Sequence, residues 1–288
     1  MKRKSCFIMG LPDAGKTSFL AALWYSLNSV INNMLTIKRY DDNHAYLSNI
    51  SEAWADGKPV SRTRREFEED EIRLLLAHGE DIFEITFPDL SGETFQHQYE
   101  EREIENSLME YVQNSSSVLL FVNPEKIIEP TLISTIPQHL RVEPEHTTNI
   151  PYKERIPRAD DPTQVQLVDL LQFVMYIRNN APIKLGIIIS AWDLVESNFD
   201  LCDKSPQVVI KTILPLLWQY ITANKYLFVP EYFGVSAQGG NLKDCQIRDS
   251  LLEKIDPCDR IIVVDEQKKR YNDITLPLYK IAGEDLDQ

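Results

Sequence analysis

The residues best suited to chemistry form an octet near the start of the chain, Gly10-Leu11-Pro12-Asp13-Ala14-Gly15-Lys16-Thr17. Gly10 and Gly15 carry no Cβ, so backbone N–H groups can curl around phosphate oxygens. The Lys16 ammonium suits the β- and γ-phosphates of a nucleotide, and the Thr17 hydroxyl suits an Mg²⁺ ion. The octet predicts a site for nucleotide phosphates, with these nucleotide-binding residues: Gly10, Asp13, Ala14, Gly15, Lys16, Thr17 and Ser18.

The octet lies between the two elements that a phosphate-binding loop requires. The apolar run 5–9 is typical of a buried strand, and residues 16–31 have the pattern of a helix. The helix N-terminus adds a partial positive charge at the phosphates. A chance occurrence of the octet would not supply this context.

A second motif, Asp89-Leu90-Ser91-Gly92-Glu93, follows the strand-like run 83–88. Asp89 at the end of a buried strand can hold Mg²⁺ through a water, and the Gly92 N–H can approach the γ-phosphate. The pattern D-x-x-G recurs by chance in many chains. Its place after a strand and downstream of the octet favours a functional assignment.

Two further polar stretches follow buried strands. The stretch Ser190-Ala191-Trp192-Asp193 directly follows the apolar run 186–189. The stretch Ser236-Ala237-Gln238 directly follows the apolar run 232–235. Ligands of open α/β sheets bind at the carboxyl ends of the strands. Taken singly, each stretch is equally consistent with an ordinary polar strand terminus.

The composition limits the possible class of protein. The chain has 288 residues, of which 43 % are hydrophobic and 26 % charged, so it can form a full core with an ordinary surface. The net charge of −14 argues against nucleic-acid binding. No apolar run is long enough for membrane insertion, and the four cysteines lack metal-ligand spacing. We therefore expect free thiols and a cytoplasmic location.

Strands alternate with helices along the chain, which predicts a mostly parallel central sheet with helices on both faces, a three-layer α/β fold. The run 65–77 is expected to pair with 82–87 as a hairpin, although it is also compatible with a helix. One helix is expected at 98–113, and another at 206–223 that Pro215 should kink. We expect a single domain over 1–288, with an inserted proline-rich loop at about 124–162 and a C-terminal extension at about 241–288.

In this order, the four motifs resemble those of the P-loop GTPases of the translation-factor-related (TRAFAC) class. The resemblance implies a Ras-like P-loop NTPase fold, Mg²⁺ as cofactor and GTP or GDP as ligand. It implies that Asp193 accepts hydrogen bonds from guanine N1 and N2, donors that adenine lacks. The Ala237 N–H would meet guanine O6. The implied base-side residues are Ser190, Trp192, Asp193, Ser236, Ala237 and Gln238.

The chain departs from the family pattern at one base-reading position. The lysine of N-K-x-D, whose stem packs on the base, is Ala191 here. Trp192 either stacks on the base in its place or fills core space. The family also has a second magnesium-ligating threonine, for which Thr63 is the first candidate and Thr36 the second, so the implied metal ligands are Thr17, Thr63 and Asp89.

The implied catalytic residues are Lys16, Thr63 and Glu93. Glu93 stands where small GTPases usually carry a glutamine that orients the attacking water. A carboxylate can orient water, but it cannot donate to the phosphoryl oxygens and its charge lies near a polyanion. We expect slow hydrolysis. His97 is the alternative participant, although a histidine on a polar helix start is more often simply exposed.

Several stretches resemble the bacterial double-GTPase families more narrowly, namely G-x-P-x-x-R-T at 57–63, F-P-D-L-S-G-E at 87–93, S-A-W-D at 190–193 and N-D-I-T-L-P-L at 272–278. The resemblance implies a molecular switch that works beside a second GTPase and effector proteins, in systems suspected of roles in biological conflict. Two alternatives stay open. One is an ATPase or other P-loop phosphotransferase. The other is a non-catalytic, nucleotide-holding scaffold whose proline-rich segment grips a partner.

Overall fold

The computed structural model describes residues 3–30, 33–39, 44–60, 72–88, 92–131, 134 and 155–283. These residues build a nine-stranded sheet with the strand order β2-β3-β4-β1-β5-β6-β7-β8-β9. The strands are β1 (Arg3–Met9), β2 (Thr36–Arg39), β3 (Ile72–His78), β4 (Asp81–Phe87), β5 (Ser117–Val122), β6 (Ile183–Ser190), β7 (Phe228–Ser236), β8 (Ile262–Val264) and β9 (Arg270–Tyr271).

The five central strands, β4-β1-β5-β6-β7, are parallel, and the two strands at each edge are antiparallel to their neighbours. Because parallel strands end at the same edge of a sheet, the segments that follow β1, β4, β5, β6 and β7 lie along one rim. The four sequence motifs follow four of these strands. The sheet therefore brings to one rim stretches that lie as far apart in the chain as residues 10–17 and 236–238.

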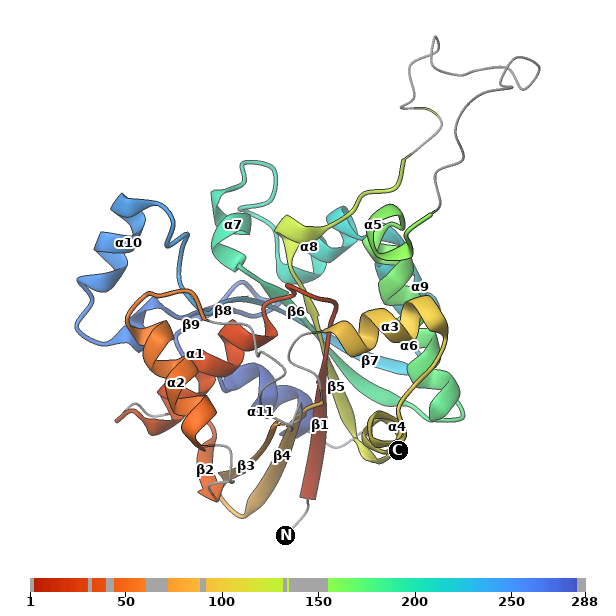
Figure 1. Ribbon diagram of the computed structural model, residues 1–288, viewed down its shortest axis with the longest axis horizontal. Helices are drawn as coiled ribbons and strands as arrows, with labels where there is room; N and C mark the ends of the chain where they lie inside the picture. Colours follow the sequence, from red (N-terminus) through yellow and green to blue (C-terminus); the bar gives the residue numbers. More distant parts are fainter. Residues whose placement is uncertain are drawn as a thin grey trace.

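Helices cover both faces of the sheet, so its central strands are buried on both sides (Figure 1). Cys6 and Ile8 of β1 face one apolar cluster, and Phe7 and Met9 face the other. The first cluster includes α1 (Lys16–Asn28), α2 (His44–Ala55) and α11 (Leu276–Gly283). The second includes α3 (Glu93–Glu101), α4 (Asn106–Asn114), α6 (Thr163–Ile177), α8 (Pro206–Ile213) and α9 (Pro215–Ala223).

Short elements complete the described chain: α5 (Pro157–Asp160), α7 (Trp192–Ser197), α10 (Cys245–Leu252), and the 3₁₀ turns η1 (Pro124–Lys126) and η5 (Pro257–Arg260). The predicted three-layer α/β fold is confirmed. So is the hairpin, which β3 and β4 form around Gly79 and Glu80. The early part of its first arm, residues 65–71, lies outside the described residues.

The single helix predicted at 98–113 is wrong, because two helices, α3 and α4, occupy this stretch. Arg102 ends α3 with a left-handed backbone, at φ 63°, and its N–H donates to the Gln98 carbonyl. The Arg102 guanidinium pairs with Asp169 of α6 and lies over the Tyr99 ring. The left-handed conformation of Arg102 cannot continue the helix.

Pro215 breaks the predicted helix at 206–223 instead of kinking it. Leu214 has φ −134° and ψ 60°, outside the helical region. The ring of a proline clashes with a helical conformation at the preceding residue, so α8 ends there and α9 begins at Pro215 itself.

The two flanking segments predicted around the main domain are partly described. Residues 241–288 contribute α10, β8, β9 and α11, and β8 pairs with β7, so this segment continues the central sheet. Of the proline-rich stretch, the structure describes η1, α5 and their neighbours, and residues 135–154 lie outside the description. The domain boundaries stay a prediction.

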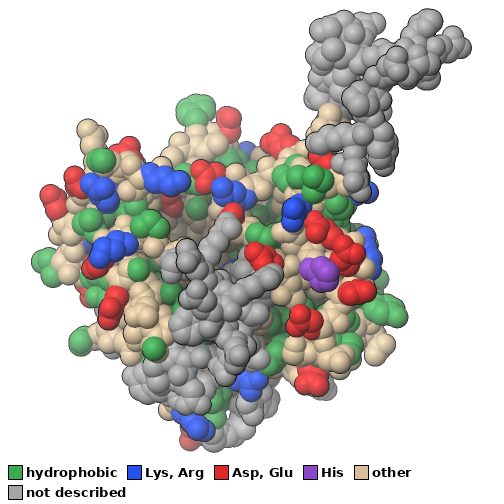
Figure 2. Space-filling model, in the orientation of Figure 1, with side chains coloured by type: hydrophobic (Ala, Val, Ile, Leu, Met, Phe, Trp, Pro, Cys, Tyr) green, Lys and Arg blue, Asp and Glu red, His purple; other side chains and the backbone are tan. Residues whose placement is uncertain are grey.

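The described surface mixes charges of both signs. Figure 2 shows acidic and basic side chains interspersed over one face of the molecule. Among the helices that the structure describes, none combines the length and the apolar character needed to cross a membrane.

Candidate functional site

The phosphate-binding loop connects β1 to α1, and its lysine folds back over the loop. The Lys16 Nζ donates to the Gly10 carbonyl at 2.7 Å and to the Leu11 carbonyl at 3.2 Å. The side chain is only 2 % exposed. The ammonium is thus held against the loop by backbone oxygens, close to the N-terminus of α1.

The two loop glycines allow close contact with neighbouring strand ends. A Cβ on Gly10 would lie 3.0 Å from the Phe121 carbonyl oxygen of β5. Gly15 has φ +93°, and a Cβ there would lie 2.8 Å from the Ser190 Cβ of β6. Glycine is therefore required here by packing between strand ends, in addition to the room it leaves for phosphates.

Asn123, which the sequence analysis did not select, ties this loop to the end of β5. Its Nδ2 donates to the Asp13 carbonyl at 2.9 Å, and its Oδ1 accepts from the Glu125 N–H at 3.0 Å. Asp13 has a left-handed backbone, at φ 60°. A polar residue directly after a buried strand, on the same rim as Asp193, was the signal that could have identified it.

The two base-side stretches meet through hydrogen bonds. The Ser236 hydroxyl donates to the Asp193 carboxylate, and the Gly239 N–H donates to the Ser236 oxygen at 2.9 Å. Ser190 donates from its hydroxyl to the Val122 carbonyl at 3.2 Å, which links the ends of β6 and β5. The Ser236 hydroxyl therefore restricts the orientation of the Asp193 carboxylate.

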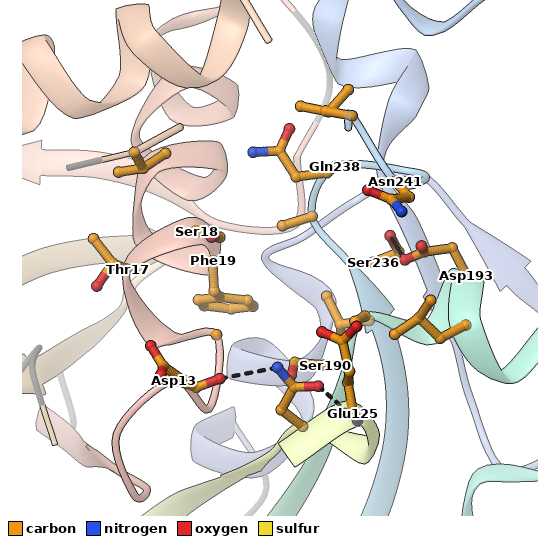
Figure 3. A pocket seen from close by; sticks show the side chains of 18 of the residues that line it. Asp13, Thr17, Ser18, Phe19, Glu125, Ser190, Asp193, Ser236, Gln238 and Asn241 are labelled. Carbon is orange, nitrogen blue, oxygen red and sulfur yellow. Dashed lines mark hydrogen bonds between the residues drawn. The ribbon is translucent and has the colours of Figure 1, made fainter. Parts of the chain in front are cut away.

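A pocket of about 670 Å³ lies between the phosphate-binding loop and these base-side stretches. Figure 3 shows Asp13 and Thr17 on one side of it, and Asp193 and Ser236 on the other. The predicted residues that line it are Asp13, Ala14, Gly15, Lys16, Thr17, Ser18, Ser190, Asp193, Ser236, Ala237 and Gln238. Lining residues that the sequence analysis missed include Lys58, Asn123, Glu125, Lys126, Asn241 and Lys243.

Trp192 does not line the pocket, so the structure gives its assignment as a nucleotide-binding residue no support. The side chain is 3 % exposed and packs on Gly234 so closely that a Cβ there would overlap the indole ring. Trp192 fills core space beneath β7, which is the second of the two interpretations of the sequence. Gly10 is also absent from the lining.

Gly92, the glycine of the second motif, lies directly against the phosphate-binding loop. Gly92 precedes α3 with φ +82°, and a Cβ there would come within 2.6 Å of Leu11, Pro12 and the Lys16 ammonium. Glu93, the first residue of α3, is exposed, and so is His97. Neither of these two side chains lines the pocket.

The proposed magnesium ligands are described only in part. Asp89 and Thr63 lie outside the described residues. Thr36 lies on the edge strand β2, where its hydroxyl donates to the Ala77 carbonyl at 3.3 Å, and it does not line the pocket. Among the described residues there is no cluster of three or more acidic, histidine or cysteine ligands. The Thr17 hydroxyl is a hard oxygen donor, which fits Mg²⁺ because this ion is usually held by one or two protein ligands and by substrate phosphates.

Comparison with known proteins identifies a family for this chain. A family model described as Double-GTPase 1 matches residues 7–281. No curated protein matches the sequence. The chain is similar to the structure of the Arl6 BBS3 small GTPase from Trypanosoma brucei with bound GppNp, at 11 % identity and a TM-score of 0.37, over 88 % of this chain and 96 % of that one. It is also similar to the GTP-bound Ski7 GTPase-like domain from S. cerevisiae, at 13 % identity and a TM-score of 0.37, over 83 % of this chain and 43 % of that one. At these TM-scores the likeness adds nothing to the strand order and the family match.

Proposed function

Because the chain belongs to the Double-GTPase 1 family, and is accordingly a GTP-binding protein, we propose that it binds GTP with Mg²⁺ in this pocket and hydrolyses it slowly as a molecular switch. The observation that carries the proposal is the convergence on one pocket of residues 13–18 with Ser190, Ala191, Asp193 and residues 236–238. Phosphate-binding and base-reading groups then stand at its opposite ends, as a nucleotide requires (Figure 3).

Different residues of the pocket bind different parts of the nucleotide. Backbone N–H groups of the loop, with the Lys16 ammonium, would bind the phosphates, and the Thr17 hydroxyl would hold the metal ion. Asp193 accepts from guanine N1–H and N2–H, and the Ala237 N–H donates to O6. The hydrogen bond from Ser236 supports this role because it fixes the carboxylate in advance.

Hydrolysis requires a positioned water at the γ-phosphate, and we assign that role to Glu93. The contact of Gly92 with the loop supports this assignment because it brings the start of α3 beside the Lys16 ammonium. The carboxylate orients the water but adds negative charge beside the phosphates, so turnover is slow. When bound, Mg²⁺ would neutralise charge on the phosphate oxygens, with Thr17, Thr63 and Asp89 as its proposed protein ligands.

We extend the proposal to a protein partner, a second GTPase or an effector. Its basis is the sequence resemblance to bacterial double-GTPase families, in which a small GTPase works beside such proteins in systems suspected of roles in conflict.

Single-turnover hydrolysis tests the proposal. The full chain is mixed with a small amount of GTP or ATP labelled at the γ-phosphate, with Mg²⁺ or with EDTA, and release of phosphate is followed. We expect slow, Mg²⁺-dependent release from GTP, a rate below about 1 s⁻¹, and none from ATP. The Thr17→Ala variant is the matched control and should release none. Faster release from ATP than from GTP would contradict the proposal, and GTP that stays bound and uncleaved would identify a nucleotide-holding module.

A further inference from the structure

A residue outside all the nucleotide motifs supports the base-side loop. Trp54, near the end of α2, donates from its indole Nε1 to the Ala237 carbonyl at 2.9 Å. Its side chain is fully buried in the core. The segment that follows α2, residues 57–60, lines the same pocket. The end of α2 is thus in contact with the pocket and with the loop that reads the base.

The contact with Ala237 acts on the residue that matters for base recognition. The N–H of Ala237 is the group proposed to meet guanine O6, and its carbonyl is the group that Trp54 holds. Both groups flank one Cα, so fixing the carbonyl restricts the direction of the N–H. On the other edge of the base, Asp193 is held by a different contact, the hydroxyl of Ser236.

Arg260 holds Trp54 and the loop from behind. Its guanidinium lies 4.8 Å from the centre of the Trp54 ring, and its Nη2 donates to the Ala55 carbonyl at 2.7 Å, at the end of α2. Arg260 is 1 % exposed, and its own carbonyl lies so close to Gly239 that a Cβ there would overlap it. Burial lowers the pKa of the guanidinium. A buried cation over the ring and at the helix C-terminus fixes the indole firmly.

We propose that Trp54 is a positioning residue for base recognition, which sets selectivity at guanine O6 by holding the Ala237 peptide through its indole N–H. The inference rests on the proposed guanine site and adds α2 to it. Without the indole donor, the part-buried Ala237 carbonyl loses its partner, and the loop shifts to find another. The shift turns the Ala237 N–H away from O6, while Asp193 keeps its contact with Ser236.

Three nucleotides distinguish contacts at guanine O6 from contacts at the 2-amino group. GDP presents O6 and the 2-amino group, 6-thioguanosine diphosphate replaces only O6 by sulfur, a weaker acceptor, and inosine diphosphate lacks only the 2-amino group. Affinities of the full chain for all three are measured by calorimetry, for the wild type and for Trp54→Phe. Phenylalanine keeps a ring for Arg260 and removes the N–H. We expect GDP affinity to fall about tenfold, the affinity for the thio analogue to change less than about twofold, and the ratio of GDP to inosine diphosphate to stay unchanged.

Phe228→Leu is the control, because Phe228 is a buried ring at the other end of β7, far from the rim. It should lower the melting temperature and leave two affinity ratios unchanged, that of GDP to inosine diphosphate and that of GDP to the thio analogue. If Trp54→Phe leaves both ratios unchanged, or lowers both together, Trp54 is merely structural and the inference is wrong. A wild-type chain that binds none of the three nucleotides overturns the proposed function, and this inference with it.

A measurement on the wild-type chain serves if Trp54→Phe does not fold. The chain has four tryptophans, and Phe variants at the other three positions identify the indole N–H signal of Trp54 by NMR. GDP and inosine diphosphate should shift that signal alike, and 6-thioguanosine diphosphate should shift it differently. Equal shifts with all three nucleotides would overturn the inference.

Discussion

The substitution Asp193→Asn separates base reading from general stability. The Asp193 carboxylate accepts from Ser236 and, in the proposal, from guanine N1–H and N2–H. Asparagine keeps one oxygen and places an amide N–H₂ where the second acceptor was. The 2-amino donor of guanine then faces the amide donor of asparagine. Xanthine carries O2 in place of the 2-amino group, and this oxygen can accept from the amide.

The size of the effect follows from the contacts. A hydrogen bond to a charged group is worth about 1.5–3 kcal/mol, and the new amide also faces the 2-amino donor of guanine, so the substitution costs GTP at least about 3 kcal/mol, or about 100-fold in affinity. The oxygen that remains can still accept from the Ser236 hydroxyl, so the ligand-free fold should lose less than about 1 kcal/mol. In a domain of this size that loss lowers the melting temperature by less than about 4 °C.

Competition binding of GTP and xanthosine triphosphate to wild type and variant is the assay. The ratio of the two affinities should reverse in Asp193→Asn, a result that general destabilisation cannot produce. If the variant loses both nucleotides equally, the carboxylate has a structural role and Ser190–Asp193 does not read the base.

Three further substitutions address the phosphate end of the pocket. Lys16→Ala should abolish tight nucleotide binding by calorimetry, and loss of the two carbonyl contacts of Lys16 should lower the ligand-free melting temperature by about 4–8 °C; binding close to that of the wild type would contradict the assignment. Gly92→Ala forces a left-handed alanine, at about 1–2 kcal/mol, into the Leu11–Pro12 backbone, so GTP hydrolysis should stop while GDP affinity stays within about threefold, and an unchanged rate of phosphate release would refute the contact. Glu93→Gln removes a charge and adds a donor, so single-turnover hydrolysis should become about tenfold faster; a slower rate would mean that the carboxylate itself is needed.

The central part of the fold could be predicted because its signals are local. The run 118–122 is apolar at every position and lies in β5, which is buried throughout. The octet 10–17 begins directly after strand β1 and runs into helix α1, as the glycine-containing motif predicts. Asp193 and Ser236 could be placed on one rim because parallel strands end together, and their direct hydrogen bond agrees with that placement.

The features that the sequence analysis missed depend on contacts between distant segments. Arg102 ends α3 with a left-handed backbone, and its guanidinium pairs with Asp169, 67 positions later in the chain. An apolar ring such as Trp192 suits both a stack on a base and a place in the core, so the sequence does not distinguish the two. The close contact of Trp192 with Gly234 favours the core. Trp54 looks like an ordinary buried ring of α2 until the position of Ala237 is known.

The most direct test of the account is a calorimetric titration of the nucleotide-free chain with GDP and with ADP, both with Mg²⁺. The account predicts that GDP binds at least about 100-fold more tightly, since an unpaired buried acceptor at Asp193 costs an adenine nucleotide several kcal/mol. Equal affinities for GDP and ADP, or binding of neither, would contradict the claim that this pocket is a guanine-nucleotide site.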